Sequence, residues 1–197
     1  MRTRLSLIAL ALLITTPLPA AAPESPAAGV AVNAAKLRIN GTSTMHDYSL
    51  ATTLLIVKSA VVGGPSLLEP GMLQEFELQI PLKNFVSDKD GLTKKMLETM
   101  KADKYPFITF ALTNYTVEGT VVRATGTLTV AGVARPVDVE LNVKETPAGL
   151  HVSGTHALSM KDFGIKPPTM FMGMLKTNEQ VTITFELQLT HAAKASN

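Results

Sequence analysis

Apolar and polar side chains alternate strictly in three separate stretches of the chain. Phe76, Leu78 and Ile80 alternate with glutamates and a glutamine, and residues 137–144 and 182–189 repeat the same period of two. Because successive side chains of a β-strand point to opposite faces, this pattern predicts strands with one wet face and one apolar face. The dominant architecture is therefore predicted to be antiparallel β-sheet.

Four further stretches have the composition of strands, rich in Thr, Val, Ile and Leu, and the short connections contain Gly or Pro. These stretches are 48–58, 107–117, 120–131 and 149–160. About eight antiparallel strands, joined mainly by hairpins, predict an all-β, up-and-down lipocalin-like barrel, because closure leaves no sheet edge exposed. A two-sheet sandwich explains the alternation equally well, but it gives no obvious role to the one helix that the sequence predicts.

That helix is indicated by a change of period. Leu92, Met96 and Met100 recur every four residues with charged side chains between them. This spacing predicts an amphipathic helix of about three turns that begins near residues 88–91 and ends before the next proline. Residues 162–178 contain two glycines and a Pro-Pro pair, and they predict one long loop. A loop of that length in a compact domain is usually functional or disordered.

The N-terminal residues have the three parts of a secretory signal peptide. Arg2 and Arg4 supply a positive start, and an apolar run is followed by small residues. The apolar run is about half of the roughly 20 residues that a transmembrane helix needs, so a membrane-spanning anchor is not expected. We therefore divide the chain into a signal peptide at 1–22, a flexible leader at 23–35, one barrel domain at 36–191 and a C-terminal tail at 192–197.

Removal of the signal peptide leaves a formally neutral chain. The 18 Lys and Arg, minus the two in residues 1–22, leave 16 against 16 Asp and Glu. Nucleic acid is therefore not an expected partner, since its recognition needs clustered positive charge. The chain has no cysteine, so an exported form depends on its core and not on disulfides for stability. These observations favour a periplasmic protein, with full secretion left open.

Several short blocks of sequence are distinctive when their order and spacing are taken together. They are Gly41-Thr42-Ser43-Thr44-Met45-His46-Asp47-Tyr48, Pro81-Leu82-Lys83-Asn84-Phe85, Asp90-Gly91-Leu92, Lys104-Tyr105-Pro106-Phe107-Ile108-Thr109-Phe110, Gly126-Thr127-Leu128-Thr129-Val130-Ala131-Gly132-Val133-Ala134-Arg135-Pro136-Val137 and Lys161-Asp162-Phe163-Gly164-Ile165. Over residues 38–190 the chain thereby resembles the YceI-like family. One departure is Tyr48, at a position where one branch of that family often has tryptophan.

The resemblance implies an extended lipocalin-like fold, export to the periplasm and binding of a polyisoprenoid or similar lipid inside the barrel. A linear apolar ligand needs an elongated dry cavity, in which each buried methylene contributes roughly 0.8 kcal/mol. The inward-facing apolar residues suit such a cavity, or they simply fill the core of a structural or interaction protein. The candidate ligand-binding residues are Phe76, Leu78, Ile80, Met96, Met100, Phe110, Leu128, Val130, Leu158, Met160, Phe163, Met170, Phe171, Met172, Ile183 and Phe185, with His46 as a polar group at the pocket mouth.

Methionine is concentrated in the predicted helix and loop. The chain contains nine methionines, and this flexible, polarizable side chain suits a surface that adapts to an apolar chain. We interpret the helix and the loop as two covers near the barrel mouth, with ordinary core packing as the alternative. Met170, Met172 and Met174 also have the spacing of a soft Cu(I) site, so a periplasmic copper-binding module is a further alternative.

The sequence gives little support to an enzymatic function. Ser43, His46 and Asp47 are close along the chain, but Ser43 and His46 would point to opposite faces of a strand. The chain contains no nucleophile elbow, no zinc-protease motif and no phosphate-binding glycine loop. We therefore predict a carrier or sequestering protein without enzymatic activity or cofactor, with a homodimer left open at an incompletely closed seam.

Overall fold

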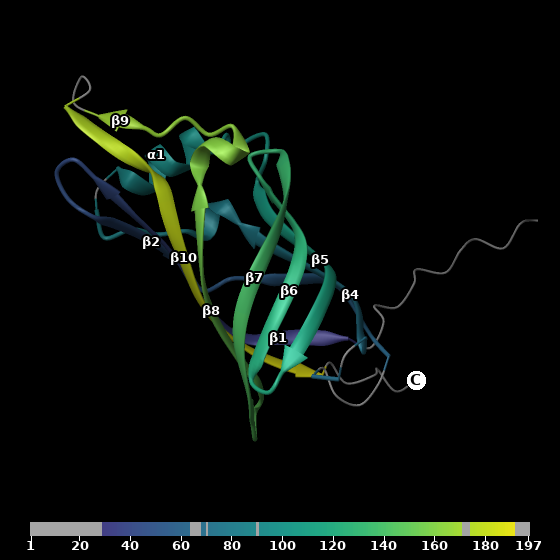
Figure 1. The fold of residues 1–197 in the computed structure, drawn as a ribbon. Helices are drawn as coiled ribbons and strands as arrows, with labels where there is room; N and C mark the ends of the chain where they lie inside the picture. The colour runs from purple at the N-terminus through teal and green to yellow at the C-terminus, as the bar shows by residue number, and fades with distance from the viewer. Residues whose placement is uncertain (1–28, 64–67, 70, 90, 171–173, 192–197) are drawn as a thin grey trace, which may run out of the picture.

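The computed structural model describes residues 29–63, 68–69, 71–89, 91–170 and 174–191. The expected signal peptide and tail lie outside these described residues, as do the first residues of the expected leader. Within the described ranges the chain is mostly β-strand (Figure 1).

Nine strands form one antiparallel path in the order β2-β1-β10-β8-β7-β6-β5-β4-β3, and β9 pairs with β10 beside this path. Neighbours along the path follow the chain order, and the first strand pairs with the last, which is the up-and-down topology that hairpins produce. The strands are β1 (Val30–Ser43), β2 (Tyr48–Thr52), β3 (Ile56–Val62), β4 (Leu73–Pro81), β5 (Phe107–Glu118), β6 (Val121–Val130), β7 (Val133–Thr146), β8 (Gly149–Ser159), β9 (Thr169–Met170) and β10 (Leu175–His191).

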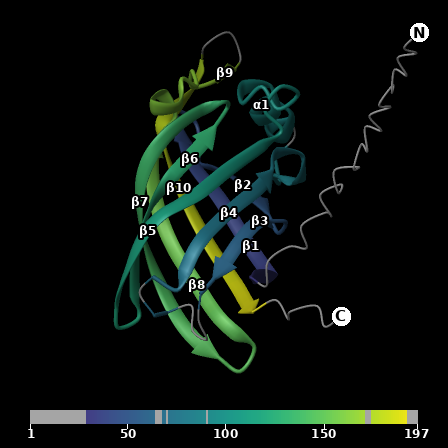
Figure 2. The ribbon, with the colours of Figure 1, turned by 90° about the vertical axis from the view of Figure 1, so that its right-hand side faces the viewer.

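The sheet curls around one apolar interior, as the predicted lipocalin-like barrel requires (Figure 2). Leu37 of β1 lies opposite Phe185 of β10, so the two terminal strands meet. β2 and β3 are the two ends of the path, and within the described residues they share no ladder. Instead, β3 packs against β1, where Val30 and Ala60 are buried in one apolar cluster. Side-chain packing therefore joins β3 to β1 where no hydrogen-bonded ladder connects the ends of the sheet.

Two strand boundaries differ from the predictions. β1 begins at Val30, so residues 30–35 belong to a strand and not to a flexible leader. Their partners are in β10, from Val30 opposite His191 to Ala35 opposite Leu187. The stretch 48–58, expected as one strand, is divided between β2 and β3. The partner of residues 30–35 is distant in sequence, and local composition carries no information about it. The stretch 48–58 is divided because its two halves pair with different neighbours, β2 with β1 and β3 with β4.

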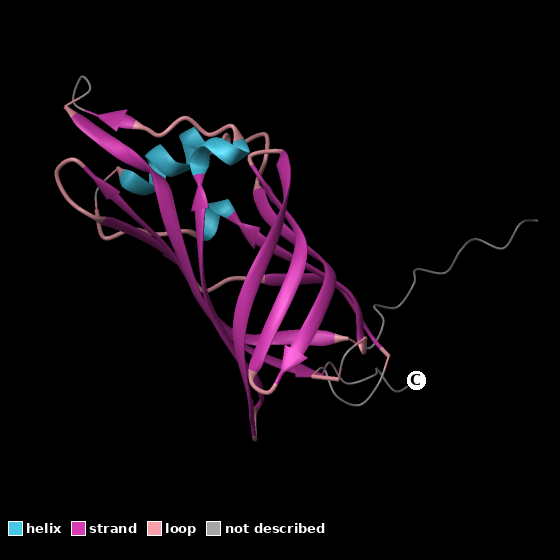
Figure 3. Ribbon diagram, in the orientation of Figure 1, coloured by secondary structure: helices cyan, strands magenta, loops and turns pink. Residues whose placement is uncertain are grey.

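The helical segments gather at one end of the barrel (Figure 3). They are η1 (Leu82–Asn84), α1 (Leu92–Thr99) and η2 (Met160–Phe163). α1 has eight residues, about two turns and not three, because Lys101 adopts a φ of 54° that right-handed helix cannot continue through. None of the helices in the described part of the chain is long and apolar enough to cross a membrane.

Residues 162–178, expected as one long loop, contain regular structure. η2 ends at Phe163, whose side chain is buried, and Gly164 follows in the left-handed conformation. β9 then pairs with the first residues of β10, with Met170 opposite Leu175. The segment is therefore a short arm on the start of β10, at the same end of the barrel as α1 (Figure 1).

Buried anchors join the helical end to the barrel. Leu82 and Phe85 have no exposed surface, and they are the largest fully buried side chains among the described residues. The Leu82 amide donates to the Pro106 carbonyl at 2.9 Å. An isolated bridge pairs Val86 with Ala51 of β2, with both N···O distances at 2.8 Å. These contacts hold α1 in place over the interior.

Candidate functional site

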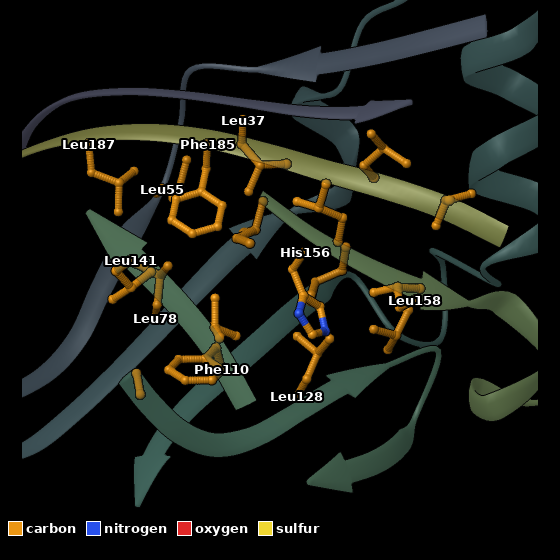
Figure 4. A pocket seen from close by; sticks show the side chains of 18 of the residues that line it. Leu37, Leu55, Leu78, Phe110, Leu128, Leu141, His156, Leu158, Phe185 and Leu187 are labelled. Carbon is orange, nitrogen blue, oxygen red and sulfur yellow. The ribbon is translucent and has the colours of Figure 1, made fainter. Parts of the chain in front are cut away.

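The barrel contains a partly open cavity of about 310 Å³ with an almost entirely apolar wall. Side chains from α1, η2 and most of the strands contribute to it, and Figure 4 shows leucines and phenylalanines of several strands directed into one common space. Strand alternation produces this wall. On β6, for example, Val122, Ala124 and Leu128 are buried inside, whereas Arg123 and Thr127 are exposed outside.

Most of the apolar residues predicted to line a pocket are brought together here. Met96 and Met100 reach the cavity from α1, and the others come from the strands and η2. The predicted residues that line the cavity are Phe76, Leu78, Ile80, Met96, Met100, Phe110, Leu128, Val130, Leu158, Met160, Phe163, Ile183 and Phe185.

His46, expected as a polar group at the pocket mouth, is not among the residues that line the cavity. It lies exposed in the connection between β1 and β2. There the Ser43 hydroxyl donates to the His46 carbonyl at 2.7 Å and accepts from the His46 amide at 3.2 Å. These two contacts form a tight turn directly after β1.

Only part of the methionine-rich segment 170–174 lies within the described residues. Phe171 and Met172 lie outside the described residues, and of Met170 only the backbone is described, in β9. Met174 is 76% exposed and does not line the cavity. Among the described residues no three His, Cys, Asp or Glu side chains are grouped as a metal site requires. The thioether copper site stays a prediction.

Several lining residues were missed from the sequence, although the signal was present. Leu37 and Ile39 of β1 alternate with Lys36 and Arg38, and both line the cavity. They were missed because the composition of the preceding residues suggested a loose segment. His156 of β8 was not among the predicted ligand-binding residues either, and it also lines the cavity.

Two glycines allow phenylalanine rings to lie along the wall. A Cβ at Gly154 would lie 2.5 Å from the Phe185 ring directly opposite on β10. A Cβ at Gly126 would likewise lie 2.5 Å from the Phe110 ring. Because glycine leaves this space free, each ring packs onto the sheet and leaves the centre of the barrel open.

Two titratable side chains in the wall are shifted by burial. Burial lowers the pKa of the His156 imidazole from its ordinary value, and the negative charge of Asp138 acts in the opposite direction. Burial raises the pKa of the Tyr48 hydroxyl. Both shifts favour the uncharged form. The wall is therefore neutral at these two positions, which suits an apolar occupant.

The size of the cavity limits what it can enclose. An apolar cavity of about 150 Å³ holds one benzene ring, so 310 Å³ gives room for on the order of a dozen carbon atoms. Such a space fits a short apolar chain or one part of a longer chain. It is large for an accidental packing defect, since voids bigger than a water molecule are few in protein interiors.

Comparison with solved structures finds the same fold at low sequence identity. BcnA of Burkholderia cenocepacia superposes with a TM-score of 0.64 at 17% identity, covering 79% of this chain and 96% of that one. A polyisoprenoid binding domain from Saccharophagus degradans, implicated in plant cell wall breakdown, gives 0.62 at 18% identity, covering 83% and 98%. A Campylobacter jejuni YCEI protein gives 0.54 at 18% identity, covering 72% and 85%.

A sequence search of curated proteins found no match. The family model of the YceI-like domain, however, matches residues 57–189, which is most of the chain and includes all strands from β4 to β8. Together with the curled antiparallel sheet and its apolar interior, this match confirms the resemblance seen in the sequence blocks. The chain belongs to the YceI-like domain family.

Proposed function

We propose that this protein binds the chain of an apolar lipid, of the polyisoprenoid class, inside the barrel, and carries or sequesters it in the periplasm. The observation that supports this most strongly is the apolar cavity inside the barrel. Burial of each methylene in such a space contributes roughly 0.8 kcal/mol. The polyisoprenoid binding domain among the structural neighbours supports the same ligand class.

The periplasmic part of the proposal is supported by the sequence. Residues 1–22 have the composition of a signal peptide, and the chain has no cysteine. An apolar chain that has left a membrane needs a protein cavity to cross an aqueous compartment, because its exposure to water is unfavourable in proportion to its area. We propose that binding itself, without chemical conversion of the ligand, is the activity.

The first experiment recovers the natural occupant. The full chain, expressed in a bacterial host and purified without detergent, is analysed by native mass spectrometry and by solvent extraction. We expect the purified protein to retain an apolar molecule that appears as added mass and that solvent extraction releases. After delipidation, the protein is expected to take up farnesol, an isoprenoid alcohol of three units.

A matched pair of variants locates the ligand. The chain has no tryptophan, so each of Leu141→Trp and Asn142→Trp introduces a single fluorescent reporter. Leu141 lines the cavity, whereas its neighbour Asn142 is exposed on the outer face of β7. Farnesol should change the emission of the inner reporter and leave that of the outer reporter constant. Empty protein in the mass spectrometer, together with unchanged emission from both reporters, would overturn the proposal.

A further inference from the structure

His156 is an imidazole in a wall of apolar side chains. It lies in β8, directly opposite Ile183 of β10. Its ring lines the cavity and projects into it beside Leu128 and Leu158 (Figure 4). The polar atoms of this ring therefore face the space that a ligand would occupy.

The His156 ring has no hydrogen-bond partner among the described residues. A partly buried imidazole that lacks a partner is unfavourable, since each of its nitrogens loses contact with water when an apolar ligand fills the space. Packing does not require a histidine here, because leucines serve at comparable inner positions such as Leu128. A ligand atom that bonds to the ring would remove this cost.

Other polar groups of the cavity wall are bonded within the chain. The Tyr115 hydroxyl donates to the Glu69 carbonyl at 2.6 Å and accepts from the Leu73 amide at 3.0 Å. On α1, the Thr99 hydroxyl donates to the carbonyl of Lys95 at 2.7 Å. The Lys95 ammonium pairs with a Glu98 carboxylate oxygen at 3.7 Å.

Two further polar side chains of the wall have a different placement. The Tyr48 ring and hydroxyl lie against Gly41. Thr177 lies near the start of β10, close to the helical end of the barrel. The position of His156 differs from both, because its ring projects into the space beside Leu128 and Leu158 (Figure 4).

The charge state of His156 defines the chemistry that it can recognise. Burial disfavours the imidazolium form, and the lining residues include no carboxylate to compensate for it. Asp138, the one charged group acting on the ring, lies on the exposed outer face of β7, where it accepts a hydrogen bond from Thr125 at 2.6 Å. A neutral imidazole offers one N–H donor and one nitrogen acceptor, which suits a hydroxyl or carbonyl oxygen.

We propose that His156 is the polar contact for a single uncharged oxygen on the bound lipid. The ligand class is then an isoprenoid-like chain that carries an alcohol, phenol or carbonyl group, with that group inside the barrel. This inference rests on the proposed function, because it names the ligand class of the same cavity.

The test compares two ligands that differ by the oxygen. Dissociation constants for farnesol and for the hydrocarbon farnesene are measured with wild type, His156→Leu and His156→Gln. A neutral hydrogen bond corresponds to a change of about 2- to 13-fold in affinity. We expect His156→Leu to weaken farnesol binding about 10-fold relative to farnesene. Glutamine retains a donor and an acceptor, so His156→Gln should preserve most of the preference.

Leu158→Met is the matched control, because Leu158 is the next inner position of β8 and also lines the cavity. It should affect both ligands alike. A second measurement needs no variant: the imidazole nitrogen resonances of His156 in wild type should shift on addition of farnesol and stay in place with farnesene.

Each outcome decides a different point. Equal changes for both ligands in His156→Leu, or unshifted resonances with farnesol, overturn the role of His156 and leave lipid binding intact. Tighter binding of farnesoic acid than of farnesol near neutral pH overturns the uncharged ligand class. Failure of wild type to bind any of the three compounds overturns the proposed function itself, and the role of His156 with it.

Discussion

β6 and β8 each present an apolar inner face with a central glycine to the cavity, and they differ in polarity at one position. The two strands run in the same direction, since both are antiparallel to β7. Each carries a central glycine under a phenylalanine ring, Gly126 in β6 and Gly154 in β8. Two residues further on, β6 has Leu128 and β8 has His156.

This difference separates the residues that packing requires from the one residue that is available for ligand recognition. The glycine and the ring above it recur in both strands because they solve the same geometric problem, which is to fit an aromatic side chain while the barrel stays open. The leucine in β6 shows that the following position accepts an apolar residue. The imidazole of β8 therefore adds a chemical property that the architecture does not need.

The largest expected effect comes from imposing the β8 arrangement on β6. Leu128→His removes a buried apolar side chain and places a second unpaired imidazole in the wall, so we expect a loss of about 2–4 kcal/mol in the free energy of unfolding. Urea denaturation measures it. Thr127→His, on the exposed outer face, is the control. A loss below about 1 kcal/mol would show that the wall tolerates polar groups generally.

The next effect concerns the glycines that both strands share. Gly154→Ala and Gly126→Ala each force a phenylalanine ring away from the wall, and we expect each to lower the free energy of unfolding by about 1–3 kcal/mol. The ring would then occupy part of the cavity and reduce farnesol uptake. In a Phe185→Leu background, Gly154→Ala should lower the free energy of unfolding by less than it does in wild type, because the ring that it displaces is absent. An equal loss in both backgrounds would show that contact with the ring is not the cause.

A smaller effect concerns pH and belongs to β8. The pKa of His156 is lowered in the folded protein from the ordinary value of 6.5. In the pH interval between these two pKa values, the unfolded chain therefore binds more protons than the folded chain. Stability contributed by the neutral ring is therefore present above that interval and lost below it. Between about pH 7.5 and about pH 5, wild type should lose more free energy of unfolding than His156→Gln. Parallel pH profiles would show that the ring titrates as it does in water.

The smallest effect is expected on the outer faces of the two strands. Thr127 of β6 and Thr155 of β8 are both exposed. Replacement of either by alanine should change the free energy of unfolding by no more than about 0.5 kcal/mol and leave farnesol binding unchanged. A larger change at one of the two threonines would mean that the strands also differ on the outside.

Much of the inner wall could be predicted from the sequence, because alternation assigns each residue of a strand to one face. Phe76, Leu78 and Ile80 were identified in this way, and the four-residue spacing identified Met96 and Met100. Such patterns are local, and they persist in the folded barrel.

What could not be predicted depends on register between distant strands. The fit of Phe185 to Gly154 follows from the pairing of β10 with β8, and no single stretch contains it. The same holds for β1, whose first residues look like a leader until β10 pairs with them. Alternation along β8 assigns His156 to the apolar face. Only the residues around it in space show that its ring has no hydrogen-bond partner within the described chain.

The pairing of Val30 with His191 has a consequence for how the molecule forms. β10 is synthesised after the other strands of the path, so β1 and β8 lack their shared neighbour until β10 has been made. Contacts between chain ends are slow to form, because a large loop must close before they contribute. In the proposed export route this delay is useful, since a chain that cannot fold early stays extended enough to be threaded across a membrane.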